Sequence, residues 1–138
     1  MLKKTMTYTD YNGVERKEDF YFNLSKAELI EMGLSENGGL DALIDKIISE
    51  KDQKRIIELF KQIILKAYGE KSLDGKHFVK SEEISNAFSQ TEAYSDLFME
   101  LAFNSKAGAD FVNALIPKNM AKEIEKYMKS DNQVTAIE

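Results

Sequence analysis

Cysteine is absent from the sequence and histidine occurs once, which excludes several kinds of reactive or metal-binding site. Without cysteine the chain has no disulfide framework, thiol nucleophile or thiolate zinc site. The single imidazole of His77 cannot form a metal site that needs two or more histidines. No stretch approaches the roughly 18 consecutive apolar residues of a membrane span, and the polar alternation after Met1 is unlike a signal peptide. We therefore expect no membrane partner.

Positive charge is scarce as well. Asp and Glu number 24 against 19 Lys and Arg, the net charge is -5, and Arg16 and Arg55 are the only arginines. Proteins that bind nucleic acid need clustered lysine and arginine for phosphate contacts and base readout. We therefore expect no nucleic-acid partner. The 138 residues, 43% of them hydrophobic, suit one soluble cytoplasmic domain with a hydrophobic core.

The N-terminal segment carries the pattern of a β-hairpin. Residues 2–9 and 14–22 alternate partly between polar and β-branched or aromatic side chains, and Asn12-Gly13 between them is typical of a type I′ turn. We expect Phe20 and Phe22 to face the domain, together with Tyr8. An isolated two-stranded hairpin is marginally stable, so this one must pack on helices or add strands from another chain.

The remainder shows helical periodicity with N-cap signals, which predicts a compact bundle of about six short helices. Ser25 and Glu28 form a capping box at the first helix. The strongest pattern begins after Asp52 and ends at Gly69, where a left-handed residue is expected. Further helical segments are expected around 40–48, after the N-caps Ser81 and Thr91, around 111–116 and around 120–128. Residues 105–108 are expected to separate the helix after Thr91 from the segment around 111–116.

These elements predict one domain over residues 1–129. Its fold class is mainly α, with the hairpin over 2–23 in front of a helical body over 25–129. Residues 130–138 are polar and are expected to form a flexible tail. No internal repeat or low-complexity tract points to a second domain.

No enzyme motif emerges from the polar cluster at residues 70–80. Asp74-Gly75 predicts a turn, and a calcium-loop register that places Gly75 sixth puts Ser81 where a bidentate glutamate is needed. His77 could serve as a general base, yet no nucleophile, phosphate-binding or zinc motif accompanies it. We expect no enzymatic activity and no catalytic, cofactor-binding or metal-binding residues.

Two apolar stripes allow two interpretations each. The stripe of Tyr94, Leu97, Phe98 and Leu101, with Met99 and Phe103 beside it, is wider than one helix face requires. It predicts either a helix buried on all sides or an exposed patch for a partner. The C-terminal stripe is either a docked helix or an adaptable interface, and consists of Met120, Ile124, Tyr127 and Met128.

Three stretches resemble a known family. They read TYTDYNGVERKEDFYFNLSKAELIEM, YGEKSLDGKHFVKSEEISNAFSQTEAYSDLFMELA and FVNALIP. Their residues are similar to those of the tail assembly chaperones of long-tailed phages and prophages of Gram-positive bacteria. The resemblance spans roughly residues 5 to 117 and contains no catalytic motif. The residues after Pro117 lie outside it.

The resemblance implies a small non-enzymatic factor that binds the tape measure protein and promotes assembly of the tail tube around it. It further implies a location in the host cytoplasm, absence from the mature virion, and no cofactor. The tail tube protein and self-association are further candidate interactions, and a small phage structural or head-tail joining protein is the alternative. The expected partner-binding residues are the C-terminal stripe of Met120, Ile124, Tyr127 and Met128, with Phe98 and Phe103 as the alternative.

Overall fold

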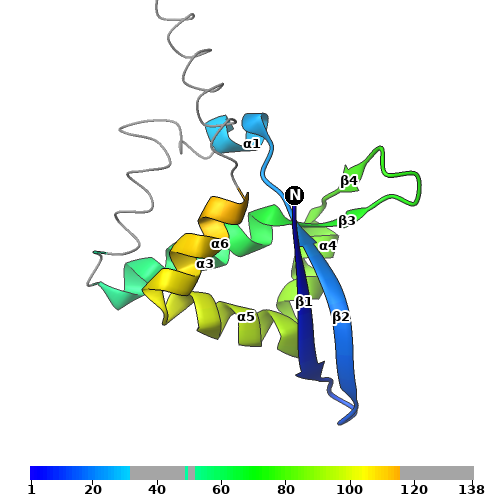
Figure 1. Ribbon diagram of the computed structural model, residues 1–138, viewed down its shortest axis with the longest axis horizontal. Helices are drawn as coiled ribbons and strands as arrows, with labels where there is room; N and C mark the ends of the chain where they lie inside the picture. The colour runs from blue at the N-terminus through cyan, green and yellow to red at the C-terminus, as the bar shows by residue number, and fades with distance from the viewer. Residues whose placement is uncertain (32–48, 50–51, 116–138) are drawn as a thin grey trace, which may run out of the picture.

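The fold combines a small antiparallel sheet with a group of helices, as the computed structural model of the protein shows (Figure 1). The structure describes residues 1–31, 49 and 52–115. About half of these residues are helical, in five helices, so the expected class of mainly α with about six helices fits only roughly. The helices predicted around 40–48 and 120–128, and the tail over 130–138, lie outside the described residues.

The sheet has four strands rather than the two of the predicted hairpin. They are β1 (Leu2–Thr9), β2 (Glu15–Phe22), β3 (Tyr68–Lys71) and β4 (Phe78–Val79). Their order is β1-β2-β3-β4, and every neighbouring pair is antiparallel. The turn predicted at Asp74-Gly75 belongs to a second hairpin, which sequence reasoning missed because its strands are too short to show alternation.

The connection between β1 and β2 confirms the hairpin but corrects its turn type. The Gly13 N–H donates to the Asp10 carbonyl oxygen at 3.0 Å, so Tyr11 and Asn12 are the central turn residues. Gly13 follows at φ 78°, the left-handed conformation that glycine adopts without strain. This is the pattern of a three-residue loop with a glycine bulge, not of a type I′ turn on Asn12-Gly13. The Asp10 side chain adds bonds from the Asn12 and Val14 N–H groups at 2.9 and 3.0 Å.

Helix α1 (Lys26–Glu31) begins with the predicted capping box. The Ser25 N–H donates to Glu28 Oε1 at 3.0 Å, and the Glu28 N–H donates to Ser25 Oγ at 3.2 Å. Helix α3 (Gln53–Ala67) begins at the predicted N-cap Asp52. It does not end at a left-handed Gly69, because the chain passes directly into β3 at Tyr68 and Gly69 pairs there with Tyr21.

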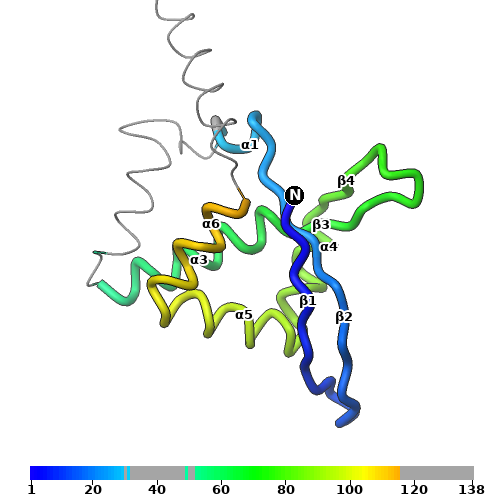
Figure 2. Tube along the Cα trace, viewed as in Figure 1, coloured from blue at the N-terminus to red at the C-terminus, as the bar shows by residue number. Residues whose placement is uncertain are grey.

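Three further helices follow the second hairpin. Ser81 and Thr91 cap α4 (Glu82–Ser89) and α5 (Glu92–Ala102) as predicted, because each side chain accepts a hydrogen bond from the N–H group three residues later. Helix α6 (Ser105–Leu115) ends the described part and begins within the stretch 105–108 that was expected to separate two helices. Figure 2 shows α3, α5 and α6 gathered on one side of the β1–β2 hairpin. The inward face of the hairpin therefore packs on helices, as its marginal stability requires.

The core lies between the sheet and these helices. Phe22, Phe60, Ile64 and Leu97 are fully buried, and together they come from β2, α3 and α5. Aromatic rings link the layers, with Phe22 edge-on to Phe111 at 5.4 Å between centroids. The predicted inward residues Phe20 and Phe22 are buried, and Tyr8 packs against the core.

Candidate protein-binding surface

Helices α5 and α6 meet at a tight corner. The Phe103 N–H donates to the Met99 carbonyl oxygen at 3.3 Å, which closes the last turn of α5. Asn104 then caps α6, because its side-chain oxygen accepts from the Ala107 N–H at 3.1 Å and its carbonyl accepts from the Gly108 N–H at 2.9 Å. Local hydrogen bonds therefore fix the backbone from which the Phe103 side chain projects.

Two large apolar side chains point outward at this corner. Met99 is 54% exposed and Phe103 is 55% exposed. Leu97 and Leu101, on the opposite side of α5, are buried, and Phe98 is half-buried between the two sides. The helix is therefore not buried on all sides. One face of α5 forms core, and a narrow band on the other face remains accessible.

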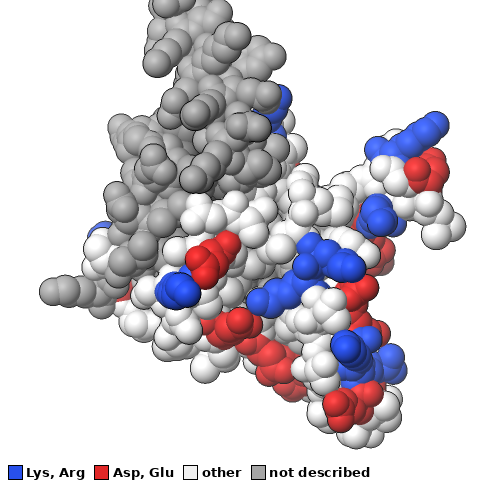
Figure 3. Space-filling model, viewed as in Figure 1, with Lys and Arg blue, Asp and Glu red and all other residues white. Residues whose placement is uncertain are grey.

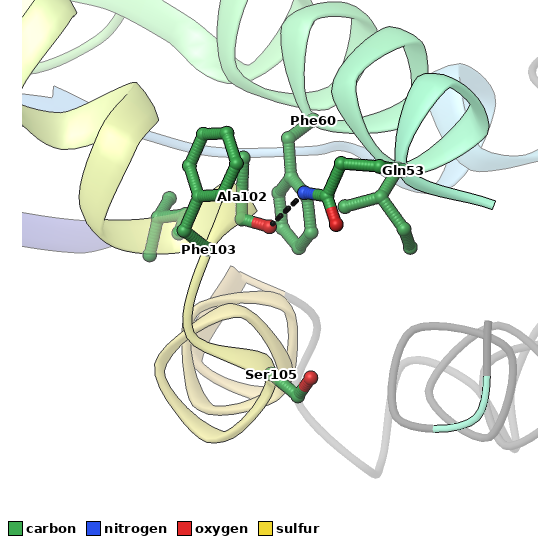
Figure 4. Close-up of a pocket in the computed structure, with 7 residues that line it drawn as sticks. Gln53, Phe60, Ala102, Phe103 and Ser105 are labelled. Carbon is green, nitrogen blue, oxygen red and sulfur yellow. Dashed lines mark hydrogen bonds between the residues drawn. The ribbon is translucent and has the colours of Figure 1, made fainter. Parts of the chain in front are cut away.

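A small cavity lies beside the exposed band, between α3 and the corner (Figure 4). The Gln53 side chain reaches from α3 and donates from Nε2 to the Ala102 carbonyl oxygen at 3.4 Å. The cavity volume of about 100 Å³ is well below the size of cofactor or substrate sites. Its walls consist of Gln53, Ile56, Phe60, Leu101, Ala102, Phe103 and Ser105. The corner therefore suits contact with side chains of a protein rather than binding of a small molecule.

Gly108 brings α6 close to α3 and α5 at the base of this corner. A Cβ atom at this position would lie 2.5 Å from Phe60 Cζ and 2.9 Å from the Leu101 carbonyl oxygen. Both distances are shorter than van der Waals contact, so no larger residue fits without movement. The close approach of α6 to α3 and α5 depends on this glycine.

The exposed face of α5 also carries acidic side chains. Glu92, Asp96 and Glu100 recur every four residues and therefore share one face of the helix. Glu100 Oε2 lies 3.3 Å from Lys4 Nζ of β1. Figure 3 shows acidic side chains along this side of the molecule, whereas acidic and basic ones are mixed over the sheet. Acidic groups beside an apolar band favour a partner with basic charge at its rim.

Sequence reasoning did not single out Leu73, which lies in the loop between β3 and β4. Its side chain is fully exposed, at the tip that Gly75 turns with φ 75°. Ser72 and Asp74 hold the loop, since Ser72 Oγ donates to Asp74 Oδ1 at 2.7 Å. That hydrogen bond and the one from the Lys76 N–H lower the pKa of Asp74. A leucine next to an Asp-Gly turn is the one pattern that could have indicated an exposed apolar side chain here.

His77 belongs to the same loop. Its side chain is exposed, and its backbone N–H donates to Ser72 Oγ at 3.0 Å. Among the described residues no group of three histidine, aspartate or glutamate side chains could hold a metal ion. Within the same part of the chain, no helix has both the length and the apolar character to cross a membrane.

An ion pair fastens α1 to the segment before α4. Lys80 Nζ donates to Glu28 Oε1 and Oε2 at 2.8 and 2.7 Å, and to the Asn23 carbonyl oxygen at 2.6 Å. Burial acts to raise the pKa of Glu28, but the hydrogen bonds from Lys80 and Ser25 outweigh it, and the pKa is lowered. The ion pair holds the first turn of α1 next to the segment before α4, and the Lys80 ammonium and the Glu28 carboxylate neutralise each other.

The predicted binding residues are thus divided by the structure. Phe98 and Phe103 both lie at the α5–α6 corner, one half-buried and the other exposed. Met99, which sequence reasoning treated only as a neighbour, is as exposed as Phe103. The C-terminal stripe lies outside the described residues, and consists of Met120, Ile124, Tyr127 and Met128.

Comparison with known proteins decides the family. The sequence model of a family described as phage tail assembly chaperone matches residues 1–137. The chain belongs to the phage tail assembly chaperone family. No curated protein and no solved structure matches it. A role in tail assembly through contacts with tail proteins follows from this membership, and chaperones of this kind are generally not enzymes and are not virion components.

Proposed function

We propose that this tail assembly chaperone binds the tape measure protein and promotes assembly of the tail tube around it. It acts in the host cytoplasm, for a long-tailed phage or prophage of a Gram-positive host, and leaves before the virion is complete. The tail tube protein is a second partner. The observation that carries this proposal is the pair of exposed apolar side chains, Met99 and Phe103, on a folded corner of a chaperone-family chain.

The chemistry of the corner suits a helical apolar client. A long tape measure that has not yet been enclosed by the tube exposes apolar helical faces, which need a temporary cover. Flexible methionine and aromatic side chains adapt to such faces and supply most of the affinity. Met99 and Phe103 present both side-chain types on a fixed backbone, beside a cavity of about 100 Å³.

The acidic face of α5 contributes to the rate of binding more than to its strength. Glu92, Asp96 and Glu100 attract basic groups at the rim of the client. Charges at a rim chiefly change association rate and salt dependence, whereas buried apolar anchors determine the dissociation rate. Binding should therefore persist at high salt.

The C-terminal stripe is the second candidate surface and is tested in parallel. The tape measure is co-expressed with the wild type, with Met99→Ser/Phe103→Ser, and with Ile124→Asp/Tyr127→Ser, and its co-purification is measured. Leu73→Ser is the control, because it removes a still more exposed apolar side chain, from the β3–β4 loop and not from the α5–α6 corner. Thermal unfolding of each variant distinguishes loss of binding from loss of folding.

The proposal predicts that at least one of the two double variants loses the client by tenfold or more, at unchanged melting temperature, while the Leu73→Ser control retains it. Retention of the client by both folded variants would contradict the proposal. Mass spectrometry of purified virions supplies a second check. Stoichiometric presence of the chain in mature particles would indicate a structural or head-tail joining protein instead.

A further inference from the structure

The sheet leaves one long strand edge open among the described residues. β1 is the first strand in the order β1-β2-β3-β4, and it pairs with β2 alone over all eight of its residues. Such an edge presents unpaired backbone N–H and C=O groups that can accept a further strand. Proteins usually protect such edges with charged side chains, proline, bulges or short strands. β1 has no proline and its register with β2 is continuous, and its two lysines, Lys3 and Lys4, both lie near one end.

The register identifies which residues point their backbone groups outward. Asp10 donates to the Val14 carbonyl oxygen at 2.9 Å, so this pair belongs to the hydrogen-bonded set. Antiparallel pairs alternate, and the neighbouring pair of Thr9 with Glu15 is therefore not bonded to β2. The same alternation directs four residues of β1 to the open edge, namely Lys3, Thr5, Thr7 and Thr9. All four have exposed side chains.

We propose that a second copy of this chain pairs with this edge, β1 against β1 in antiparallel orientation, so that two sheets join into one of eight strands. A two-fold axis through the middle of β1 brings threonines of the two copies opposite one another, and cross-strand threonine pairs stabilise a sheet. The edge residues Thr5 and Thr7 lie at this centre.

Charge favours a second copy in this orientation. Lys3 and Lys4 are the only charged residues of β1, and both lie near its N-terminal end. Antiparallel pairing places the lysines of the two copies at opposite ends, whereas parallel pairing would place like charges side by side. Tyr11 lies in the loop that follows the C-terminal end of β1. Its pKa is raised, first by desolvation and then by the nearby carboxylate of Glu92 in α5. The lysines of the second copy would thus approach an acidic side chain, as Lys4 approaches Glu100 in its own copy.

Proline at the open edge provides the test. Thr7→Pro removes an outward N–H from β1, while Lys17→Pro is the matched control, because Lys17 is the register partner of Thr7 and its N–H points away from β1 on the other side of the hairpin. Sedimentation of the full chain is measured up to about 1 mM, together with circular dichroism.

The wild type and Lys17→Pro should sediment as dimers at high concentration, and Thr7→Pro as a monomer with an unchanged spectrum. A wild type that stays monomeric at every concentration, or a folded Thr7→Pro that dimerises as well as the wild type, would overturn the proposal. If Thr7→Pro fails to fold, Thr7→Lys decides in its place, because two lysines at the centre of the pairing repel one another.

Cysteine cross-linking tests the orientation. Because the chain has no cysteine, any disulfide between two copies must join the introduced thiols. Antiparallel pairing about the middle of β1 places Thr5 opposite Thr7 of the second copy, so disulfide dimers are predicted when the Thr5→Cys and Thr7→Cys variants are mixed. None are predicted for Lys3→Cys or Thr9→Cys alone, because the two copies of each residue would lie at opposite ends of the strand. Dimers of Lys3→Cys and Thr9→Cys alone would indicate parallel pairing and contradict the proposed arrangement.

Discussion

Gly108→Ala sets two effects of opposite sign against each other. In the interior of a helix, alanine is favoured over glycine by about 1 kcal/mol, so reasoning from the sequence predicts that the substitution stabilises α6. The structure places the new Cβ 2.5 Å from Phe60 Cζ and 2.9 Å from the Leu101 carbonyl oxygen. Phe60 is fully buried and the carbonyl belongs to the backbone, so neither can move away freely.

The steric clash of the new Cβ should outweigh the helix preference of alanine, so the substitution should destabilise the protein. Overpacking of this kind costs about 1–3 kcal/mol, and after subtraction of the helix preference we expect a net loss of about 1 kcal/mol. For a chain of 138 residues that corresponds to a fall of roughly 3–5 °C in melting temperature. Urea unfolding gives the free energy directly, and an unchanged slope shows that the unfolded states are comparable.

Asp110 provides the internal control. Its side chain is exposed near the middle of α6, so the stability difference between Asp110→Ala and Asp110→Gly measures the helix preference in this helix without a packing change. Gly108→Ala should depart from that difference by about 2 kcal/mol in the destabilising direction. If Gly108→Ala instead stabilises the protein by the full helix preference, the close contact of α6 with α3 and α5 is refuted.

Four other substitutions test three further parts of the structure. Lys80→Met leaves the Glu28 carboxylate and a backbone carbonyl without their donor, so urea unfolding should show a loss of about 1–2 kcal/mol. The pKa of Glu28 is lowered in the folded state, so its ionised carboxylate stabilises the fold above the unfolded pKa of about 4.3. This stabilisation is lost as pH falls through the folded pKa. The wild type should therefore lose more stability than Glu28→Gln below about pH 5. Gly13→Val forces a β-branched residue to φ 78° and should cost at least about 1 kcal/mol, with increased amide exchange in the hairpin. His77→Ala should change stability by less than about 0.5 kcal/mol and leave tail assembly intact, whereas loss of assembly in a folded variant would indicate a role for the imidazole.

Local signals in the sequence were sufficient for the starts of four of the five described helices. Ser25, Asp52, Ser81 and Thr91 cap helices as predicted, because each carries a side-chain acceptor directly before an apolar periodic run. These signals depend on neighbouring residues alone, so they can be read without the fold. The burial of Phe22 follows from the same kind of local alternation.

Features that depend on distant residues could not be predicted in this way. Gly69 resembles a helix C-cap in the sequence, but Tyr21 pairs with it from a strand nearly fifty positions earlier and draws the chain into the sheet. The same long-range pairing turns 68–79 into a hairpin. Exposure of Met99 and Phe103 also depends on packing, since periodicity gives the width of an apolar stripe but not which part of it other elements cover.

Hydrogen–deuterium exchange of the chaperone, alone and bound to the tape measure protein, tests the proposed client surface most directly. The account predicts that binding slows exchange at the α5–α6 corner around residues 98–104, at the C-terminal stripe around 120–128, or at both, and leaves the β3–β4 loop around Leu73 unchanged. Slower exchange confined to that loop or to α1, with both proposed surfaces unaffected, would contradict it.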